Sequence, residues 1–204
     1  MKRSFEKFRC PSCLSKLKLI NKKLHCNSCK LDFHIINDIP RFVDSKNYTS
    51  SFGFQWNKFK KTQLDSYTKK DISRNRLYET TNFKKKSDFS NINILEAGSG
   101  AGRFTEIIAE TKANVYTFDF SSAVDSNYEN NNRFDNINFF QADILNIPFE
   151  DNYFDIVICL GVIQHTQFPF DTFCSLAKKI KPGGRLYIDV YSKRWHTYLW
   201  SKYI

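Results

Sequence analysis

A glycine-rich turn between an apolar run and a helix-like run is the feature that most constrains this chain of 204 residues. It reads "NILEAGSGAGRF" over residues 93–104, and its glycines stand at alternate positions: Gly98, Gly100 and Gly102. Glycine has no Cβ, so such a turn adopts left-handed backbone conformations and lets the main chain approach a ligand closely. At the end of a strand in an α/β sheet, a turn of this kind holds a nucleotide-bearing cofactor.

Strand-like and helix-like segments alternate after residue 91. The predicted helices are 102–111 and 171–180, and the predicted strands are 92–97, 114–120, 136–143, 153–162 and 184–191. Strands that alternate with helices indicate a doubly wound, Rossmann-like parallel sheet, with its ligand beyond the carboxyl ends of the strands. We therefore expect an α/β fold in which residues 91–204 form the cofactor-binding core.

Two cofactors compete for the glycine turn. The dinucleotide fingerprint G-x-G-x-x-G needs a glycine at position 103, where this chain has Arg103. S-adenosylmethionine has no pyrophosphate, and its ammonium suits an acidic residue before the turn, here Glu96. Its carboxylate can use the N–H groups at a helix start. Arg103 therefore argues against an NAD-dependent reductase.

Two carboxylates end predicted strands further along the chain. Asp119 ends the second strand, where a carboxylate can bind ribose hydroxyls in either cofactor. Asp143 ends the third strand, where it can accept a hydrogen bond from the adenine amino group, with Ile144 against the ring. Together with Glu96, Asp143 favours S-adenosylmethionine.

The run "ILEAGSGAGRF…FDFSSAVD…QADILNIPFEDNYFDIVICLGVIQHT…KPGGRLYIDVY" resembles the class I S-adenosylmethionine-dependent methyltransferases over about residues 90–191. Within that class it is similar to the methyltransferase type 11 group, which includes the ubiquinone and menaquinone methylases. The resemblance implies that the segment "LGVIQHT" borders the transferred methyl group. It also implies these cofactor-binding residues: Glu96, Ala97, Gly98, Ser99, Gly100, Gly102, Asp119, Phe120, Asp143, Ile144 and Leu160.

The same resemblance raises an expectation about chain length. The family's sheet usually has seven strands, whereas this sequence ends after the fifth predicted strand. We therefore expect a C-terminally truncated core whose last strands are missing, which puts the activity of the chain as given in question.

The resemblance implies methyl transfer to a small-molecule or glycan acceptor. His165, after the fourth strand, is the candidate catalytic base. The alternative for His165 is a polar strand-end residue that orients a loop. Gln164 is a candidate hydrogen-bond partner for an acceptor. A non-catalytic module that binds cofactor or a partner is a further alternative.

Two C-x-x-C pairs stand near the N-terminus, with twelve residues between them: Cys10 and Cys13, then Cys26 and Cys29. Each pair can form a knuckle with two thiolates, and two knuckles complete a tetrahedral structural Zn²⁺ site. A disulfide or a thioredoxin-type redox site is the alternative. The text "LDFHIINDIPRFV" also resembles the end of the short zinc ribbons found in many bacterial methyltransferases. We predict a Cys₄ zinc ribbon over residues 1–43.

Residues 44–90 join the two parts. Aromatic residues at loosely helical spacing suggest a helical connector packed on the core. The sharper alternative is a lid over the cofactor pocket, with Phe52, Gln55, Trp56 and Arg76 facing it.

Positive charge gathers in the N-terminal half. Residues 1–90 carry 21 Lys and Arg against 8 Asp and Glu. With the ribbon, this favours a second hypothesis, methylation of an rRNA base, by similarity to zinc-ribbon-bearing rRNA methylases. The ribbon could instead bind a protein partner. No secretory signal and no apolar run of membrane-spanning length is visible, so we expect a cytoplasmic protein.

Overall fold

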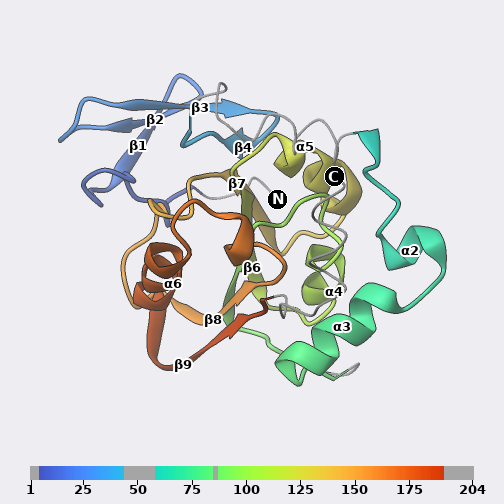
Figure 1. Ribbon diagram of the computed structural model, residues 1–204. Coiled ribbons are helices and arrows are strands. Elements are labelled where there is room, and N and C mark those ends of the chain that lie inside the picture. Colours follow the sequence, from blue (N-terminus) through green and yellow to red (C-terminus); the bar gives the residue numbers. More distant parts are fainter. Residues whose placement is uncertain (1–4, 44–57, 85–86, 191–204) are drawn as a thin grey trace.

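A computed structural model of the chain describes residues 5–43, 58–84 and 87–190. Its main sheet has five strands in the order β7-β6-β5-β8-β9, and each neighbouring pair is parallel (Figure 1). The strands are β5 (Asn93–Ala97), β6 (Asn114–Asp119), β7 (Ile137–Gln141), β8 (Phe154–Cys159) and β9 (Ile180–Ile188). The strand order reverses between β5 and β8, which is where such sheets bind ligands. The predicted doubly wound parallel sheet is confirmed.

The last strand begins earlier than predicted. Ile180 already pairs with Phe154, and the register then jumps so that Arg185 pairs with Ile156. The residues between, which include Pro182, form an irregularity in the ladder. This short first part of the strand was not predicted, because the proline and glycines of "KPGG" usually mark a turn.

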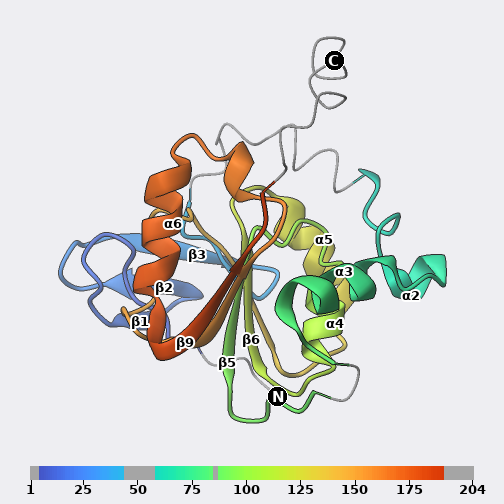
Figure 2. The same ribbon diagram turned by 60° about the horizontal axis from the view of Figure 1, so that its bottom comes forward.

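Helices cover both faces of the sheet (Figure 2). The helices α3 (Ile72–Thr81), α4 (Thr105–Ala109) and α5 (Ala123–Asn131) lie on one face, and α6 (Pro169–Lys178) lies on the other. Successive side chains of a strand point to opposite faces. Ile94 accordingly joins the core under α3–α5, and Leu95 joins the core under α6. Within the described ranges, no helix has the length and apolar character needed to cross a bilayer.

A second, antiparallel sheet precedes the main one. It contains β1 (Leu17–Ile20), β2 (Lys23–Cys26), β3 (Asp32–Ile36) and β4 (Ile39–Pro40) in that order. The first two strands occupy the segment between the two cysteine pairs, and β2 ends at Cys26. We call residues 5–43 the ribbon.

The ribbon packs on the same face of the main sheet as α6. In the described structure, the connection from β7 to β8 contains no helix, so Phe140 and Phe149 need another cover. Phe8 supplies it, with its ring centroid 5.2 Å from that of Phe140 and 5.1 Å from that of Phe149. Phe42 adds a further contact, 5.4 Å from Phe8. The ribbon and the main sheet therefore share one aromatic core.

The ribbon also covers the edge of the main sheet. Arg41 forms an isolated parallel bridge with Gln141 at the end of β7. The backbone N–H of Phe42 donates to the carbonyl oxygen of Gln141 at 2.8 Å. A free strand edge has unpaired backbone groups, and the ribbon satisfies some of them here.

Candidate active site

A cavity of about 510 Å³ opens at the carboxyl ends of the main-sheet strands. Its walls come from the glycine turn, from the residues that follow the strands, and from residues between 59 and 76. The lining residues are Phe59, Lys60, Gln63, Leu64, Arg76, Gly98, Ser99, Gly100, Ala101, Arg103, Phe104, Phe118, Asp119, Phe120, Asp143, Ile144, Leu160, Gly161, Val162, His165 and Thr166. Of the predicted site residues, nine lie on this cavity: Gly98, Ser99, Gly100, Asp119, Phe120, Asp143, Ile144, Leu160 and His165.

The glycine turn is held against the neighbouring strand by its own backbone. The N–H groups of Gly98 and Ser99 both donate to the carbonyl oxygen of Phe118, at 2.9 and 3.0 Å. Gly98 has φ +73°, and a Cβ there would lie 2.4 Å from Val162 Cγ2. A side chain at position 98 would thus close the space between the turn and the loop after β8.

Asp119 joins the turn to the end of β6. Its Oδ2 accepts the N–H of Gly100 at 2.9 Å, and its Oδ1 accepts the N–H and the hydroxyl of Ser121 at 2.9 and 2.7 Å. A carboxylate offers about four acceptor positions. One position therefore remains for a ligand, and a second ligand hydroxyl would have to share the place of Ser121.

Asp143 lines the cavity shortly after the end of β7. Its Oδ1 accepts the N–H of Leu145 at 2.9 Å, and its Oδ2 accepts the side-chain amide of Asn146 at 3.2 Å. The hydroxyl of Ser175 on α6 donates to the carbonyl oxygen of Ile144 at 2.7 Å. These bonds fix the Asp143–Ile144 pair on the rim.

Glu96 has different surroundings from those expected. It is 3% exposed and does not line the cavity. Its Oε2 accepts the hydroxyls of Thr105 and Thr117 at 2.5 and 2.8 Å, and its Oε1 is buried without a hydrogen-bond partner. Burial raises the pKa of Glu96 to about 7. The expected contact with a cofactor ammonium is therefore replaced by a buried polar network. Ala97 and Gly102, also predicted, do not line the cavity either.

Two asparagines of α5 connect this network to the glycine turn. Asn127 donates to the hydroxyls of Thr105 and Thr117 at 2.9 and 3.2 Å. Asn131 donates to Asn127 Oδ1 at 2.9 Å and to the carbonyl oxygen of Gly102 at 3.0 Å. These hydrogen bonds connect the carboxylate of Glu96 in β5 to the backbone of the glycine turn. They therefore help to fix the position of the turn.

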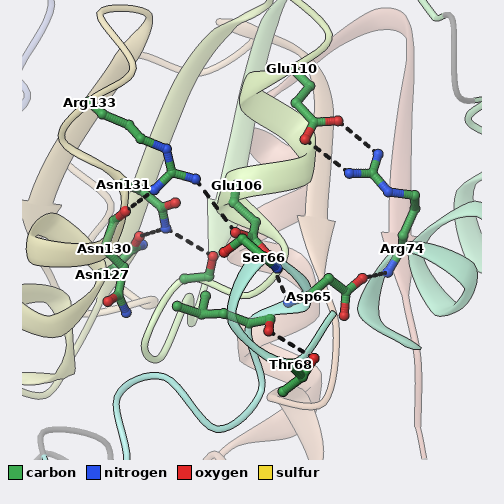
Figure 3. A network of polar contacts seen from close by, with 12 residues as sticks. Asp65, Ser66, Thr68, Arg74, Glu106, Glu110, Asn127, Asn130, Asn131 and Arg133 are labelled. Carbon is green, nitrogen blue, oxygen red and sulfur yellow. Dashed lines mark hydrogen bonds and ion pairs between the residues drawn. The ribbon is translucent and has the colours of Figure 1, made fainter. Parts of the chain in front are cut away.

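Residues 58–84, which we call the roof segment, form one wall of the cavity and are fastened to α4 (Figure 3). The carboxylate of Glu106 accepts the N–H groups of Asp65 and Ser66, at 2.9 and 3.3 Å, at the start of α2 (Asp65–Thr68). Asp65 in turn accepts the N–H groups of Ser73 and Arg74, at 3.0 and 2.8 Å, in the first turn of α3. Carboxylates at helix starts satisfy otherwise unpaired N–H groups.

Further bonds fix the roof segment to the glycine turn and to the sheet. Arg74 forms two bonds to Glu110, at 2.8 and 2.9 Å. The side-chain amide of Asn130 donates both to the carbonyl oxygen of Lys60 at 2.8 Å and to that of Ala101 at 2.9 Å. Arg76 pairs with Asp189, which also accepts the N–H of Gly161 beside β8.

Most of this wall was not predicted from the sequence. Arg76 was proposed for a lid and lines the cavity, whereas Phe59, Lys60, Gln63 and Leu64 were not predicted to line it. The other proposed lid residues, Phe52, Gln55 and Trp56, lie outside the described residues. The carboxylates of Asp65 and Glu106, which bind helix starts, fix this wall in place. The partners of Glu106 are distant in the sequence, so one sequence does not reveal the contact.

The opposite wall follows β8. Val162, His165 and Thr166 line the cavity around a 3₁₀ turn at Ile163–His165. The side-chain amide of Gln164 is buried, and neither its oxygen nor its nitrogen has a hydrogen-bond partner. The two candidates for contact with an acceptor are thus adjacent, but only His165 is on the cavity surface.

The family of this region follows from its sequence pattern as well as its fold. Residues 95–188 match a family model described as "Methyltransferase domain". The matched range extends from β5 to the end of β9 and includes the glycine turn, Asp119 and Asp143. This region is a class I S-adenosylmethionine-dependent methyltransferase domain.

The methyltransferase domain is similar to curated proteins of quinone biosynthesis. The mitochondrial ubiquinone biosynthesis O-methyltransferase of Schizosaccharomyces pombe is 28% identical over 120 residues, which is 57% of this chain and 44% of that protein. The ubiquinone biosynthesis O-methyltransferase of Coxiella burnetii is 29% identical over 111 residues, 53% of this chain and 47% of that protein. The chain thus spans less than half the length of these relatives.

A solved structure shares the fold of the methyltransferase domain. Phosphoethanolamine N-methyltransferase 1 of Haemonchus contortus, in complex with phosphoethanolamine and S-adenosylhomocysteine, aligns with a TM-score of 0.55 and 18% identity. The alignment covers 74% of this chain and 34% of that one. At this identity the likeness concerns the fold alone.

The four cysteines of the ribbon come together beside the methyltransferase domain. The Sγ atoms of Cys10, Cys13, Cys26 and Cys29 all lie within 4.8 Å of one another. Those of Cys13 and Cys26 are 3.6 Å apart, close to the roughly 3.8 Å expected between two sulfurs of a tetrahedral zinc site with Zn–S bonds of about 2.3 Å. All four cysteines are free of disulfides. The donor set and its geometry therefore fit a tetrahedral metal ion.

Replacing Gly102 tests the packing of the turn. Gly102 has φ +89°, and a Cβ there would lie 2.0 Å from Asn127 Oδ1 and 2.4 Å from Asn131 Nδ2. We expect Gly102→Ala to lower the free energy of unfolding by about 3 kcal/mol or more, since steric overlap adds to backbone strain. Urea unfolding measures the change.

Gly183 provides a matched control. It also has a positive φ, +79°, but a Cβ there would meet nothing within 4 Å. Gly183→Ala should therefore cost only the backbone strain, about 1 to 2 kcal/mol. Equal losses in the two variants would show that the asparagines move aside without cost.

The buried carboxyl of Glu96 should make stability depend on pH. Its pKa of about 7 exceeds the ordinary 4.5, so between these values the folded state holds the proton more tightly than the unfolded state. The stability contribution of Glu96 therefore falls as pH rises through this interval and is constant above it. Gln cannot ionise, so the unfolding free energy of Glu96→Gln does not have this pH dependence. We expect the unfolding free energy of the variant, relative to that of the wild type, to be about 2 to 3 kcal/mol higher at pH 8 than at pH 5. Urea unfolding at both pH values measures the gain, and the same wild-type-to-variant difference at both would contradict it.

Proposed function

We propose that the chain transfers the methyl group of S-adenosylmethionine to a small-molecule or glycan acceptor. The proposal rests chiefly on one observation: the glycine turn, Asp119 and Asp143 line a single cavity at the switch point of a doubly wound sheet. The relatives named as ubiquinone biosynthesis O-methyltransferases support a small-molecule acceptor. In this proposal residues 1–43 are the zinc ribbon, 44–90 the connector and lid, and 91–204 the methyltransferase core, in a cytoplasmic protein.

The cavity residues have distinct roles in this proposal. Asp119 binds a ribose hydroxyl at its remaining acceptor position, and Asp143 with Ile144 holds the adenine. The backbone of Gly98–Gly100 closes on the methionine part of the cofactor, where no side chain would fit beside Val162. The cofactor, when bound, supplies an electrophilic methyl group on a sulfonium. The protein then contributes mainly placement of the acceptor.

His165 is the proposed general base. It lies on the cavity wall after β8, where it can take a proton from an attacking hydroxyl or amine. The roof segment closes the opposite side of the cavity and keeps water from the reacting atoms. Arg76, which lines the cavity, borders the acceptor end, whereas Gln164 lies beside His165 and off the cavity surface.

Binding of S-adenosylhomocysteine tests the cofactor assignment. We expect calorimetric binding to the wild-type chain and at least about a tenfold loss of affinity in Asp119→Asn, since a hydrogen bond to a charged group is lost. Asp155→Asn is the matched control. Asp155 accepts the N–H of Asn93 at 2.9 Å at the amino end of the sheet, far from the cavity, and its replacement should leave the affinity unchanged. Absence of binding to the wild type would reject the proposed function.

The acceptor class is then tested with labelled cofactor and fractions of a cell extract. Label in small-molecule or glycan fractions supports the proposal. Label in RNA would instead support the alternative of base methylation by the basic ribbon. Cofactor binding without any transfer would favour a non-catalytic module.

The proposal also includes a structural Zn²⁺ held by Cys10, Cys13, Cys26 and Cys29. Four thiolates leave no open position on the ion, so it would stabilise the ribbon rather than act in catalysis. We expect metal analysis to find one zinc per chain and to find much less in Cys13→Ser. Cys174→Ser, outside the cluster, should retain the metal. Less than half a zinc per wild-type chain would rule out this part.

A further inference from the structure

We propose that Arg41 is a positioning residue for the nucleoside side of the cofactor cavity, through which the ribbon supports cofactor binding. This inference rests on the proposed function, because it concerns the same cavity. Arg41 directly follows β4 and belongs to the ribbon, not to the matched methyltransferase range.

The guanidinium of Arg41 is nearly buried and is held by the main domain. Its side chain is 11% exposed. The Nη1 and Nη2 atoms donate to the two carboxylate oxygens of Asp125 at 3.2 and 2.5 Å, and Nη1 also donates to Gln141 Oε1 at 3.2 Å. A guanidinium that pairs with both oxygens of a carboxylate has little freedom of orientation. Arg41 therefore fixes Asp125 and Gln141 relative to each other.

These two partners lie on either side of the loop that carries the cofactor residues. Asp125 is in the first turn of α5, and Gln141 is the last residue of β7. The side-chain amide of Gln141 donates to the carbonyl oxygen of Phe120 at 2.9 Å. Phe120 lines the cavity next to Asp119. A path of two hydrogen bonds thus leads from the ribbon to a backbone atom of the cavity wall.

The ribbon fixes the backbone position from which the Arg41 side chain extends. The N–H of Arg41 donates to the carbonyl oxygen of His34 in β3 at 2.8 Å. The Phe42 N–H and Gln141 carbonyl described above anchor the next residue to β7. Because Arg41 is bonded to β3 on one side and its neighbour to β7 on the other, a displacement of the ribbon sheet would move its side chain and both partners.

Arg9 makes the same kind of contact without a path to the cavity. It also joins the ribbon to the main domain, with Nε 2.8 Å from Glu150 Oε1, and its side chain is 12% exposed. Glu150 does not line the cavity and lies in the connection between β7 and β8. Arg9 therefore serves as a control whose side chain is as buried as that of Arg41 and also pairs with a carboxylate of the main domain.

The experiment compares three single variants of the full chain in calorimetric binding of S-adenosylhomocysteine. Arg41→Gln should raise the dissociation constant about tenfold, the effect expected from losing charge-assisted bonds that hold the loop. Gln141→Glu keeps an acceptor for Arg41 but removes the donor to Phe120, and it should weaken binding similarly. Arg9→Gln should bind within about twofold of the wild type, even if its unfolding free energy falls as much.

A second ligand locates the effect. Methylthioadenosine has the nucleoside but not the amino-acid end, so its affinity should fall by the same factor in Arg41→Gln and Gln141→Glu. A loss for S-adenosylhomocysteine alone would contradict a role on the nucleoside side.

Other outcomes separate this inference from the proposed function. If the wild type does not bind, the proposed function fails first. If the wild type binds and all three variants bind equally well, or lose affinity equally, Arg41 has no positioning role beyond ribbon stability. Circular dichroism shows whether each variant folds. If Arg41→Gln does not fold, the affinity of Gln141→Glu decides whether the path from Arg41 to Phe120 supports binding.

Discussion

The shape of the glycine turn depends on a contact at which a side chain is excluded, that of Gly102 with helix α5. Asn127 and Asn131 approach the α-carbon so closely that a Cβ would overlap both side chains. Their amides can then bond to the Gly102 carbonyl and to the threonines beneath it. The turn is thereby held by a network of buried polar groups, in which Glu96 Oε1 and Asn131 Oδ1 are the side-chain atoms without a partner.

This arrangement gives Glu96 its position. A strand places alternate residues on opposite faces, and Glu96 shares its face with Ile94, toward α4 and α5. The sequence placed the carboxylate at the cofactor because it directly precedes the glycines. Alternation along β5 was the better guide, and it places the carboxyl among the hydroxyls of Thr105 and Thr117.

The strands and the glycine turn were predictable because they depend on local apolar periodicity and on the absence of Cβ atoms. Helix α5 was not predicted, since the asparagine-rich "NYENNNR" has low helix propensity. Its asparagines serve the carbonyl groups of Lys60, Ala101 and Gly102, about 30 to 70 residues away. For the roof segment, a helical connector or a lid was predicted, but its place against α4 was not. Its position depends on helix starts that carboxylates of distant residues satisfy, and one sequence does not show which residues those are.

The shared aromatic core also has a consequence for synthesis of the chain. Phe8 packs on Phe149, which is made 141 residues later. At about 5 to 20 residues per second, the ribbon begins to leave the ribosome roughly 7 to 28 seconds before Phe149 does. During that interval its aromatic face has no cover, and exposed apolar surface of this kind favours aggregation. The ribbon therefore reaches its final packing only after the main sheet is made, and until then its fold depends on its own contacts.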